Sequence, residues 1–302
     1  MEQLQDFIRR GLSRRKFLAG AGCSGTAAAF TLAGCGGSRI STSTPPPTTP
    51  TTPAVTDADI LNFALNLEYL EAEFYLRATT GSGLSTTDAG GANAGIVTGG
   101  SQVPFVTPAI QQYAVEIAND ELAHVRFLRS ALGTAAVPRP AIDLTNSFNA
   151  AAMAAGIGST FNPFASEDAF IVGAFTFEDV GVTAYHGAAG LLTSTANLTA
   201  AAGIMATEAY HAAEIRTLLA QLGGNYLTYA NQISALRAAA GGGNEVAVAG
   251  NAIVAADSNS IAFDRTTNQV LNIVYLTPPP GVVKSGGFFP DGLNGTITAT
   301  TN

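Results

Sequence analysis

Cysteine is nearly absent from this sequence, which has only Cys23 and Cys35 among its 302 residues. Both lie within the first 35 residues, so the rest of the chain has no pair of cysteines and no disulfide framework can support it. A folded part of the chain must therefore be stabilised by packing and by any metal ions that it binds.

Basic residues are also few, because 14 lysines and arginines face 22 aspartates and glutamates, for a net charge of −8. Five of the basic and two of the acidic residues lie in the first 34 positions. The remainder of the chain has nine basic and 20 acidic residues, a net charge of −11. An acidic surface of this kind argues against nucleic acids and anionic lipid head groups as partners, and it concentrates cations nearby.

The N-terminal region lacks an apolar run suited to a transmembrane helix, since the stretch that ends at Ala33 is short and rich in Ala and Gly. It follows Ser13–Leu18 (SRRKFL), which resembles the twin-arginine export motif, and ends in Leu32–Cys35 (LAGC), which resembles the lipobox of bacterial lipoproteins. These resemblances predict a signal peptide at residues 1–34 and a lipid on Cys35. We expect export by the twin-arginine route and a lipid anchor that holds the protein to a membrane, in the periplasm or at the cell surface.

The chain after the signal peptide divides by composition. Residues 35–56 are rich in Ser, Thr and Pro, which bury little apolar surface and favour extended geometry, so we expect a tether. Residues 57–295 are expected to form one folded domain, followed by a Thr-rich tail at 296–302. About 245 residues beyond the tether are ample for one hydrophobic core.

Four long segments have the apolar periodicity of amphipathic helices: 57–79, 110–132, 166–192 and 197–222. Shorter helices are expected at 146–155 and 266–276, with a loop at 79–103 and irregular Gly-rich chain elsewhere beyond 222. The pattern predicts an all-α four-helix bundle with one long crossover, an extra C-terminal helix and an irregular Gly-rich tail.

The second and fourth long helices carry the same pair of ligand-type residues. Glu121 precedes His124 by three positions, and Glu208 precedes His211 by three. This spacing points both side chains of a pair to one helix face, so one ion can take an oxygen and a nitrogen ligand from a single turn. The chain has only three histidines, and two of them fall in these pairs, which favours a metal site over coincidence.

The first and third long helices add carboxylates within apolar runs. Glu68 is followed by Tyr75 seven residues later, and Glu178 is followed by Tyr185 at the same spacing. Each half of the chain therefore reads Glu, then Tyr, then Glu-x-x-His on the next helix. This repetition favours Glu68 over Glu71 as the ligand from the first helix.

Other ionisable residues in these helices are assigned different roles. Glu71 is an additional ligand, a carboxylate beside the ligands, or the partner of an arginine on a neighbouring helix. Glu73 falls on a polar stripe and is expected to face solvent. His186 is expected to be structural or at the surface, and Glu214 to lie at the surface or beside the ligands.

The ligand pattern resembles that of the ferritin-like superfamily, whose di-iron or di-manganese sites take one Glu from each of two helices and Glu-x-x-His from each of the others. The resemblance implies a ferritin-like four-helix bundle that binds two Fe or Mn ions. It gives each residue a role: Glu68 and Glu178 bind one ion each, Glu121 and Glu208 bridge both, His124 and His211 cap one each, and Tyr75 and Tyr185 are nearby hydrogen-bond donors or electron sources. Two divalent ions would neutralise four carboxylates whose burial alone is very costly.

Three segments add a narrower likeness. Leu67–Tyr75, Phe263–Tyr275 and Gly286–Gly295 are similar to a ferritin-like family that includes plant desiccation-related proteins and fungal stress proteins. The insertion after the first helix departs from compact ferritins and argues against a 24-subunit cage, while a smaller homo-oligomer stays open.

Two functions fit these features. The first is a metal-dependent protein of oxidative or desiccation stress that acts on a small oxidant, oxygen or peroxide. Removal of peroxide, as in manganese catalases of the same superfamily, is its most concrete form. The second is a non-catalytic metal-binding or structural envelope protein whose ions mainly stabilise the bundle. A metal-free bundle that keeps ligand-like residues is a third interpretation.

Overall fold

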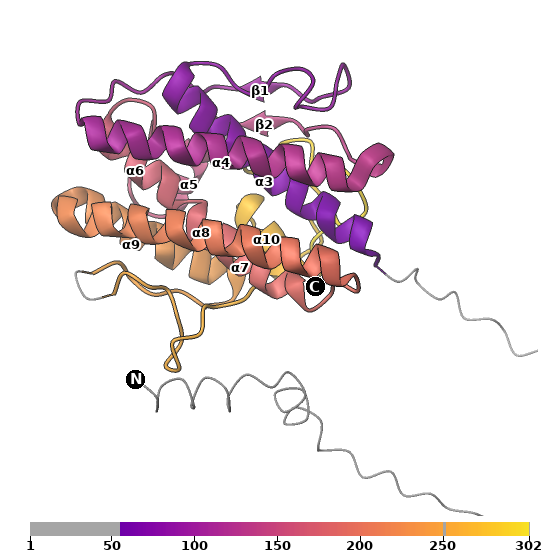
Figure 1. The fold of residues 1–302 in the computed structure, drawn as a ribbon. Coiled ribbons are helices and arrows are strands. Elements are labelled where there is room, and N and C mark those ends of the chain that lie inside the picture. The colour runs from indigo at the N-terminus through magenta and orange to yellow at the C-terminus, as the bar shows by residue number, and fades with distance from the viewer. Residues whose placement is uncertain (1–54, 250–251, 302) are drawn as a thin grey trace, which may run out of the picture. The chain divides into compact units, whose positions relative to one another are not determined.

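A computed structural model describes residues 55–249 and 252–301 of the chain. The predicted signal peptide, the lipidation site Cys35 and nearly all of the tether lie outside these residues. Helices dominate the described part, and the predicted all-α bundle is confirmed (Figure 1). Within it, none of the helices is both long enough and apolar enough to cross a membrane.

The elements form two packed helix pairs with shorter helices around them. In chain order they are α3 (Asp57–Thr80), β1 (Val97–Thr98), α4 (Pro108–Leu132), η1 (Gly133–Ala135), β2 (Ile142–Asp143), α5 (Asn146–Ala154), α6 (Glu167–Phe175), α7 (Glu178–Ala189), α8 (Thr195–Leu222), α9 (Gly224–Gly241) and α10 (Thr267–Val274). α3 packs along α4 and α7 along α8, and the two pairs meet through α3 and α7. The short strands β1 and β2 pair in parallel.

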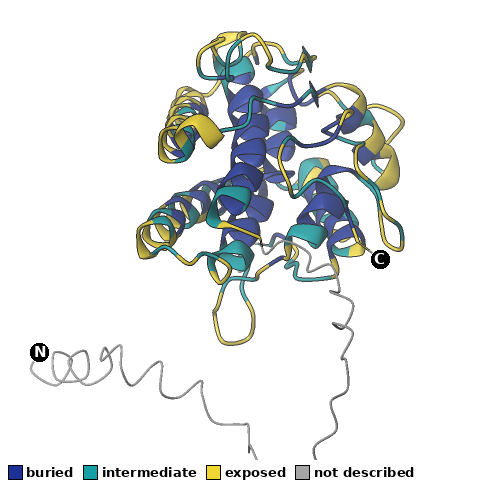
Figure 2. Cartoon of the chain, turned by 90° about the vertical axis from the view of Figure 1, so that its right-hand side faces the viewer, coloured by how far each residue is buried: buried dark blue, intermediate teal, exposed yellow. Residues whose placement is uncertain are grey.

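α3 is buried on nearly every side. It begins after Thr56, which forms a capping box with Asp59, and it ends at Gly81, which has a left-handed conformation at φ 78°. A helix with apolar residues around most of its circumference is suited to the middle of a bundle. Figure 2 shows the buried residues gathered along the inner helices and the exposed residues on the outer helices and loops.

The prediction that Glu73 faces solvent is wrong, because this side chain is fully buried. Its carboxylate accepts hydrogen bonds from Arg77 Nε at 2.8 Å, from Leu84 N at 3.1 Å and from Arg139. The insertion after α3 folds back over this face, and a Cβ on Gly83 would lie 1.8 Å from Glu73 Oε2. The polar stripe of α3 is therefore covered by chain that lies outside the helix.

The third long helix, predicted as continuous over 166–192, is broken into α6 and α7. The amides of Thr176 and Phe177 bond to carbonyls three residues earlier, at 3.1 and 3.0 Å, which tightens the turn. The Phe177 ring packs in the core, with its centroid 5.3 Å from that of Phe74 and 5.0 Å from that of Phe288. The break makes Glu178 the first residue of α7.

α9 is a further difference, because the chain beyond 222 was expected to be irregular apart from one helix near the C-terminus. Gly223 and Gly224 both have positive φ, 64° and 57°, at the junction where α8 ends and α9 begins. The buried residues of α9 do recur at helical spacing, from Ala230 through Ile233 and Arg237 to Ala240. The pattern is weak in the sequence because small and charged residues occupy several of these positions.

Three fully buried arginines connect α8, α9 and the chain before α10 to the rest of the fold: Arg216, Arg237 and Arg265. Asp179 Oδ2 lies 2.9 Å from Arg216 Nη1 and 2.8 Å from Arg237 Nη2. Glu245 lies 2.8 Å from Arg237 Nη2 and 2.6 Å from Arg265 Nη2. Burial opposes the charge of Glu245, but Arg237 and Arg265 hold its pKa below the ordinary value.

We expect Glu245→Gln to lower the free energy of unfolding by about 3–5 kcal/mol near neutral pH, because two buried guanidinium groups lose an anionic partner. The folded-state pKa of Glu245 is lowered, so its stabilisation is present above the unfolded pKa of about 4.3 and is lost as the pH falls through the folded pKa. Urea unfolding of wild type and variant, from neutral pH to below about pH 4, measures the stability difference and its loss in acid. The exposed Glu116→Gln should change stability by less than about 0.5 kcal/mol. Equal stability of Glu245→Gln and wild type at neutral pH would contradict this account.

Candidate metal centre

Ionisable side chains from four helices meet at the centre of the bundle. α3 contributes Glu68, α7 contributes Glu178, and α4 and α8 each contribute a glutamate followed three residues later by a histidine: Glu121 with His124, and Glu208 with His211. All six residues are buried, with exposed fractions between 0% and 9%. The structure thus brings together the residues that the helical spacing and the internal repetition singled out.

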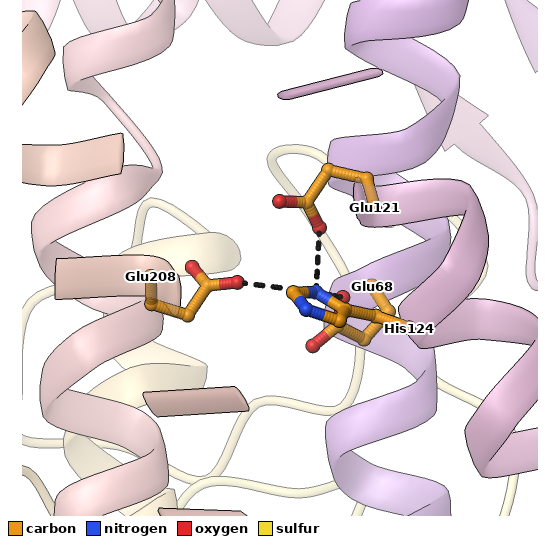
Figure 3. Close-up of side chains that lie close together, drawn as sticks. All are labelled: Glu68, Glu121, His124 and Glu208. Atoms are coloured by element: carbon orange, nitrogen blue, oxygen red, sulfur yellow. Dashed lines mark hydrogen bonds and ion pairs between the residues drawn. The ribbon is translucent and has the colours of Figure 1, made fainter. Parts of the chain in front are cut away.

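The first group within this cluster has four residues, shown in Figure 3. Ligand-type atoms of Glu68, Glu121, His124 and Glu208 all lie within 4.8 Å of one another. His124 Nδ1 is 3.2 Å from Glu68 Oε2, and it is 3.5 Å from both Glu121 Oε2 and Glu208 Oε1. One imidazole nitrogen and three carboxylates therefore surround a space of the size that one ion needs.

The second group has three residues, Glu121, Glu178 and His211. His211 Nδ1 lies 3.2 Å from Glu121 Oε1 and 3.6 Å from Glu178 Oε2. Glu121 thus belongs to both groups and faces each with a different oxygen, which is the geometry of a bridging carboxylate. Glu208 belongs only to the first group in this arrangement, whereas the family resemblance implied two bridging carboxylates.

The two tyrosines connect the halves of the chain crosswise. The Tyr75 hydroxyl donates to Glu178 Oε1, and the Tyr185 hydroxyl donates to Glu68 Oε1. Each glutamate keeps its other oxygen, Oε2, toward a histidine. Burial and the adjacent carboxylates raise the pKa of both tyrosines well above the ordinary value, so both remain hydrogen-bond donors.

Several buried atoms of the cluster have no hydrogen-bond partner among the described residues: both carboxylate oxygens of Glu121 and of Glu208, Glu178 Oε2 and His211 Nδ1. Buried polar atoms nearly always find a partner, and an unpaired carboxylate oxygen is especially costly. All of the unpaired atoms are types that ligate iron or manganese. The cluster therefore fits a pair of metal ions in its chemistry as well as in its spacing.

Without metal ions, the side chains of the cluster can balance their negative charges only by binding protons. Burial raises the pKa of Glu68 to about 7 and raises that of Glu208 well above its ordinary value. Burial opposes the charge of His124, but Glu68 and Glu121 still raise its pKa to about 10. Burial also disfavours ionisation of Glu121, yet the two nearby histidines lower its pKa to about 2. Cations at these positions would take the place of protons.

Asp120 is a residue of the centre that the sequence analysis did not identify. Its Oδ2 lies 3.2 Å from His211 Nε2, on the side of the imidazole opposite to the carboxylates. A carboxylate in this position fixes the orientation of a ligand histidine. Asp120 directly precedes Glu121, but a contact from α4 to α8 cannot be inferred from the spacing within one helix.

Glu71 and His186 lie outside the two groups of ligand-type residues. Glu71 is buried beside the cluster but belongs to neither group, and within the described residues it has no arginine partner. His186 Nδ1 lies 3.1 Å from the carbonyl oxygen of Phe263, away from the centre, which agrees with the expected structural role.

The histidines are the part of the centre closest to solvent. The His124 side chain is 11% exposed and that of His211 is 6% exposed, while the side chain of Asp120 beside them is 41% exposed. The glutamates of the cluster lie deeper, at 2% or less. The most exposed ligand side chains of the centre therefore lie on α4 and α8.

The fold and this cluster define a protein of the ferritin-like class. The family model described as "Ferritin-like domain" matches residues 56–221, more than half of the chain, and the chain belongs to this family.

Two relatives extend the likeness beyond the matched region. The chain is 32% identical over 241 residues to the desiccation-related protein PCC13-62 of Craterostigma plantagineum, an alignment that covers 71% of this chain and 76% of the relative. It is 29% identical over 272 residues to the ferritin-like catalase Nec2 of Nesocodon mauritianus, covering 80% of this chain and 84% of that protein.

We expect Glu208→Gln to stabilise the chelator-treated protein by about 1 kcal/mol or more at about pH 8, because it removes a carboxyl that burial disfavours in its charged form. The folded pKa of Glu208 is raised, so the wild type loses stability as the pH rises above the unfolded value of about 4.3, and the variant should lose less. Urea unfolding with chelator at several pH values measures the difference. Parallel pH curves for variant and wild type would show that Glu208 carries no such penalty.

Proposed function

We propose that this protein holds two iron or manganese ions in the cluster and uses them on peroxide or oxygen, in protection against oxidative or desiccation stress. The observation that carries the proposal is the set of buried carboxylate oxygens without protein partners, which two cations would satisfy. Removal of peroxide is the most concrete form of this activity.

The two groups of residues suggest how the ions would be held. Glu121 faces both groups and would bridge the ions, and both oxygens of Glu208 lack protein partners, so Glu208 has an atom available to act as the second bridge. Four carboxylates and two divalent ions form a neutral unit, which makes their burial tolerable. Carboxylate and imidazole ligands suit iron and manganese alike.

A pair of such ions, when bound, supplies a site where peroxide or oxygen binds and exchanges electrons. The residues of the chain position that site. Tyr75 and Tyr185 orient Glu178 and Glu68 by donating hydrogen bonds to them, and the two phenols would be placed to supply a proton at these carboxylates or an electron to the bound ions. Asp120 orients His211 on the side nearest solvent, where a small polar oxidant would arrive.

The names of the two relatives support this function. One is a ferritin-like catalase and the other a desiccation-related protein, and each is similar to this chain over more than two thirds of both lengths. A metal-dependent stress function is consistent with both names.

A second candidate is a non-catalytic metal-binding or structural envelope protein. The observation that favours it is the depth of the ligand carboxylates, which are at most 2% exposed and so leave little room for a substrate beside the ions. The ions would then act mainly by stabilising the folded bundle, which alone offers the assembled site.

Metal analysis of protein loaded in its native host tests both candidates. We expect about two iron or manganese ions per chain, and loss of the metal in Glu121→Ala/His124→Ala. Glu116→Ala, at an exposed position of the same helix, should retain the metal. Peroxide turnover that disappears in a folded Glu208→Ala variant would support the enzyme, whereas ions that only raise the melting temperature would support the structural candidate. Natively loaded wild type without either metal would exclude both.

We also propose export by the twin-arginine route and anchoring through a lipid on Cys35, which rests on the sequence motifs alone. Cys35→Ala should move the protein from the membrane fraction to the soluble fraction of the cell envelope. Cys23→Ala is the matched control, because Cys23 lies within the predicted signal peptide and its loss should leave the membrane association unchanged. A Cys35→Ala protein that stays membrane-bound would refute the anchor.

A further inference from the structure

An apolar cavity of about 250 Å³ lies next to the proposed metal centre. Its walls come from α3, α5, α7, α9, α10 and the adjoining chain. Among the described residues, none of its lining belongs to α4 or α8, the helices that carry the ligand histidines. The cavity therefore approaches the centre from a different side than the solvent-facing histidines do.

One end of the cavity is open and the other is closed. Ala154 of α5, Ala239 of α9 and Pro278 beyond α10 line it and are exposed, which places the mouth among these three segments. Glu71 of α3 and Gly181 of α7 also line it and are buried, so they form its inner end.

The inner end of the cavity borders the ligand cluster directly. A Cβ on Gly181 would lie 2.2 Å from Glu208 Oε2, so this carboxylate rests against the backbone of α7. Glu71 follows Glu68 by three residues on α3 and therefore lies on the same side of that helix. At the inner end, the backbone of Gly181 and the side chain of Glu71 lie between the cavity and the ligand residues.

Two polar groups in the cavity wall lack partners. No described residue hydrogen-bonds to the carboxylate of Glu71, which is 6% exposed. The Nε–H of Arg237 has no acceptor among the described residues, although Nη2 of this side chain donates to Asp179 and Glu245 and Nη1 donates to the carbonyl oxygen of Phe175. Most of the surrounding wall is hydrocarbon, and Glu71 and Arg237 are the ionisable side chains among its described residues. The unpaired groups therefore indicate a ligand that is largely apolar but has one hydrogen-bonding atom.

We propose that the cavity binds a small apolar organic molecule of about ten carbon atoms with one hydroxyl group, and that this hydroxyl lies at the inner end beside Glu71, to which it donates. The size follows by proportion, because an apolar cavity of about 150 Å³ accommodates benzene. Such a molecule would lie against the ligand cluster. That the metal centre acts on this molecule rests on the proposed function. Its binding alone requires no metal.

1-Naphthol and naphthalene are matched probes, because both have ten carbon atoms and only the first has a hydroxyl. The chain has no tryptophan, so probe fluorescence is recorded without an indole background. With the chelator-treated full chain we expect saturable binding of both, about fivefold tighter for 1-naphthol because of one additional hydrogen bond. Glu71→Leu should remove this preference while naphthalene still binds.

Two variants fill the cavity from two of the helices that line it. Ala151→Leu on α5 and Ala240→Leu on α9 should weaken binding of both probes by about tenfold or more. Ala150→Leu places the same side chain on the exposed face of α5 and should leave binding unchanged. Circular dichroism verifies that each variant folds.

Wild type that binds neither probe, or folded cavity-filling variants that bind both probes as tightly as wild type, would overturn the proposal. These measurements use protein without metal. Their failure is therefore distinguishable from a failure of the proposed metal function, which is judged by metal content and peroxide turnover.

Discussion

Burial of negative charge at the middle of the bundle is the constraint on which the rest of the structure depends. Four carboxylates and two imidazoles meet there, and several carboxylate oxygens have no hydrogen-bond partner in the part of the chain that the structure describes. Such a cluster is tolerable only with protons or cations between its oxygens. The helices must also hold the carboxylates close together against their mutual repulsion. The crossed bonds from Tyr75 and Tyr185, and the contact of Asp120 with His211, provide that support from outside the cluster.

The first turn of α7 has two buried carboxylates, Glu178 and Asp179, whose negative charges are balanced in different ways. Glu178 faces the ligand cluster, where the one basic side chain within 4.0 Å among the described residues is the titratable His211. Asp179, the next residue, faces the permanently charged Arg216 and Arg237. The second arrangement links α7 to α8 and α9 through side chains of the protein alone. The first leaves the compensation to protons or to the ions of the proposed centre, both of which exchange with solution.

The ligand pattern was readable from the sequence because helical spacing and internal repetition act within single helices. What the sequence could not supply were contacts between segments. Glu73 was assigned to solvent because its own helix has a polar stripe there, and the covering insertion leaves no signal in that stripe. The break before Glu178 depends on how Phe177 packs among distant aromatic rings. α9 was missed because small and charged residues, Ala230 and Arg237 among them, hold buried positions that apolar residues usually mark. Asp120 acts across helices, so its role appears only once α4 and α8 are placed.

The hydrogen bonds from Tyr75 to Glu178 and from Tyr185 to Glu68 help to keep the two helix pairs docked. They join residues 103 and 117 positions apart in the sequence, and both groups of ligands draw on both halves of the chain. Neither helix pair can complete a group by itself, so the centre exists only after the halves have docked. In a domain without cysteine, each ion shared between the halves would act as a removable crosslink that closes a loop of chain, from His124 to Glu208 in the first group and from Glu121 to Glu178 in the second. Like a disulfide, it would penalise the opened chain. Unlike a disulfide, it would open with the supply of metal.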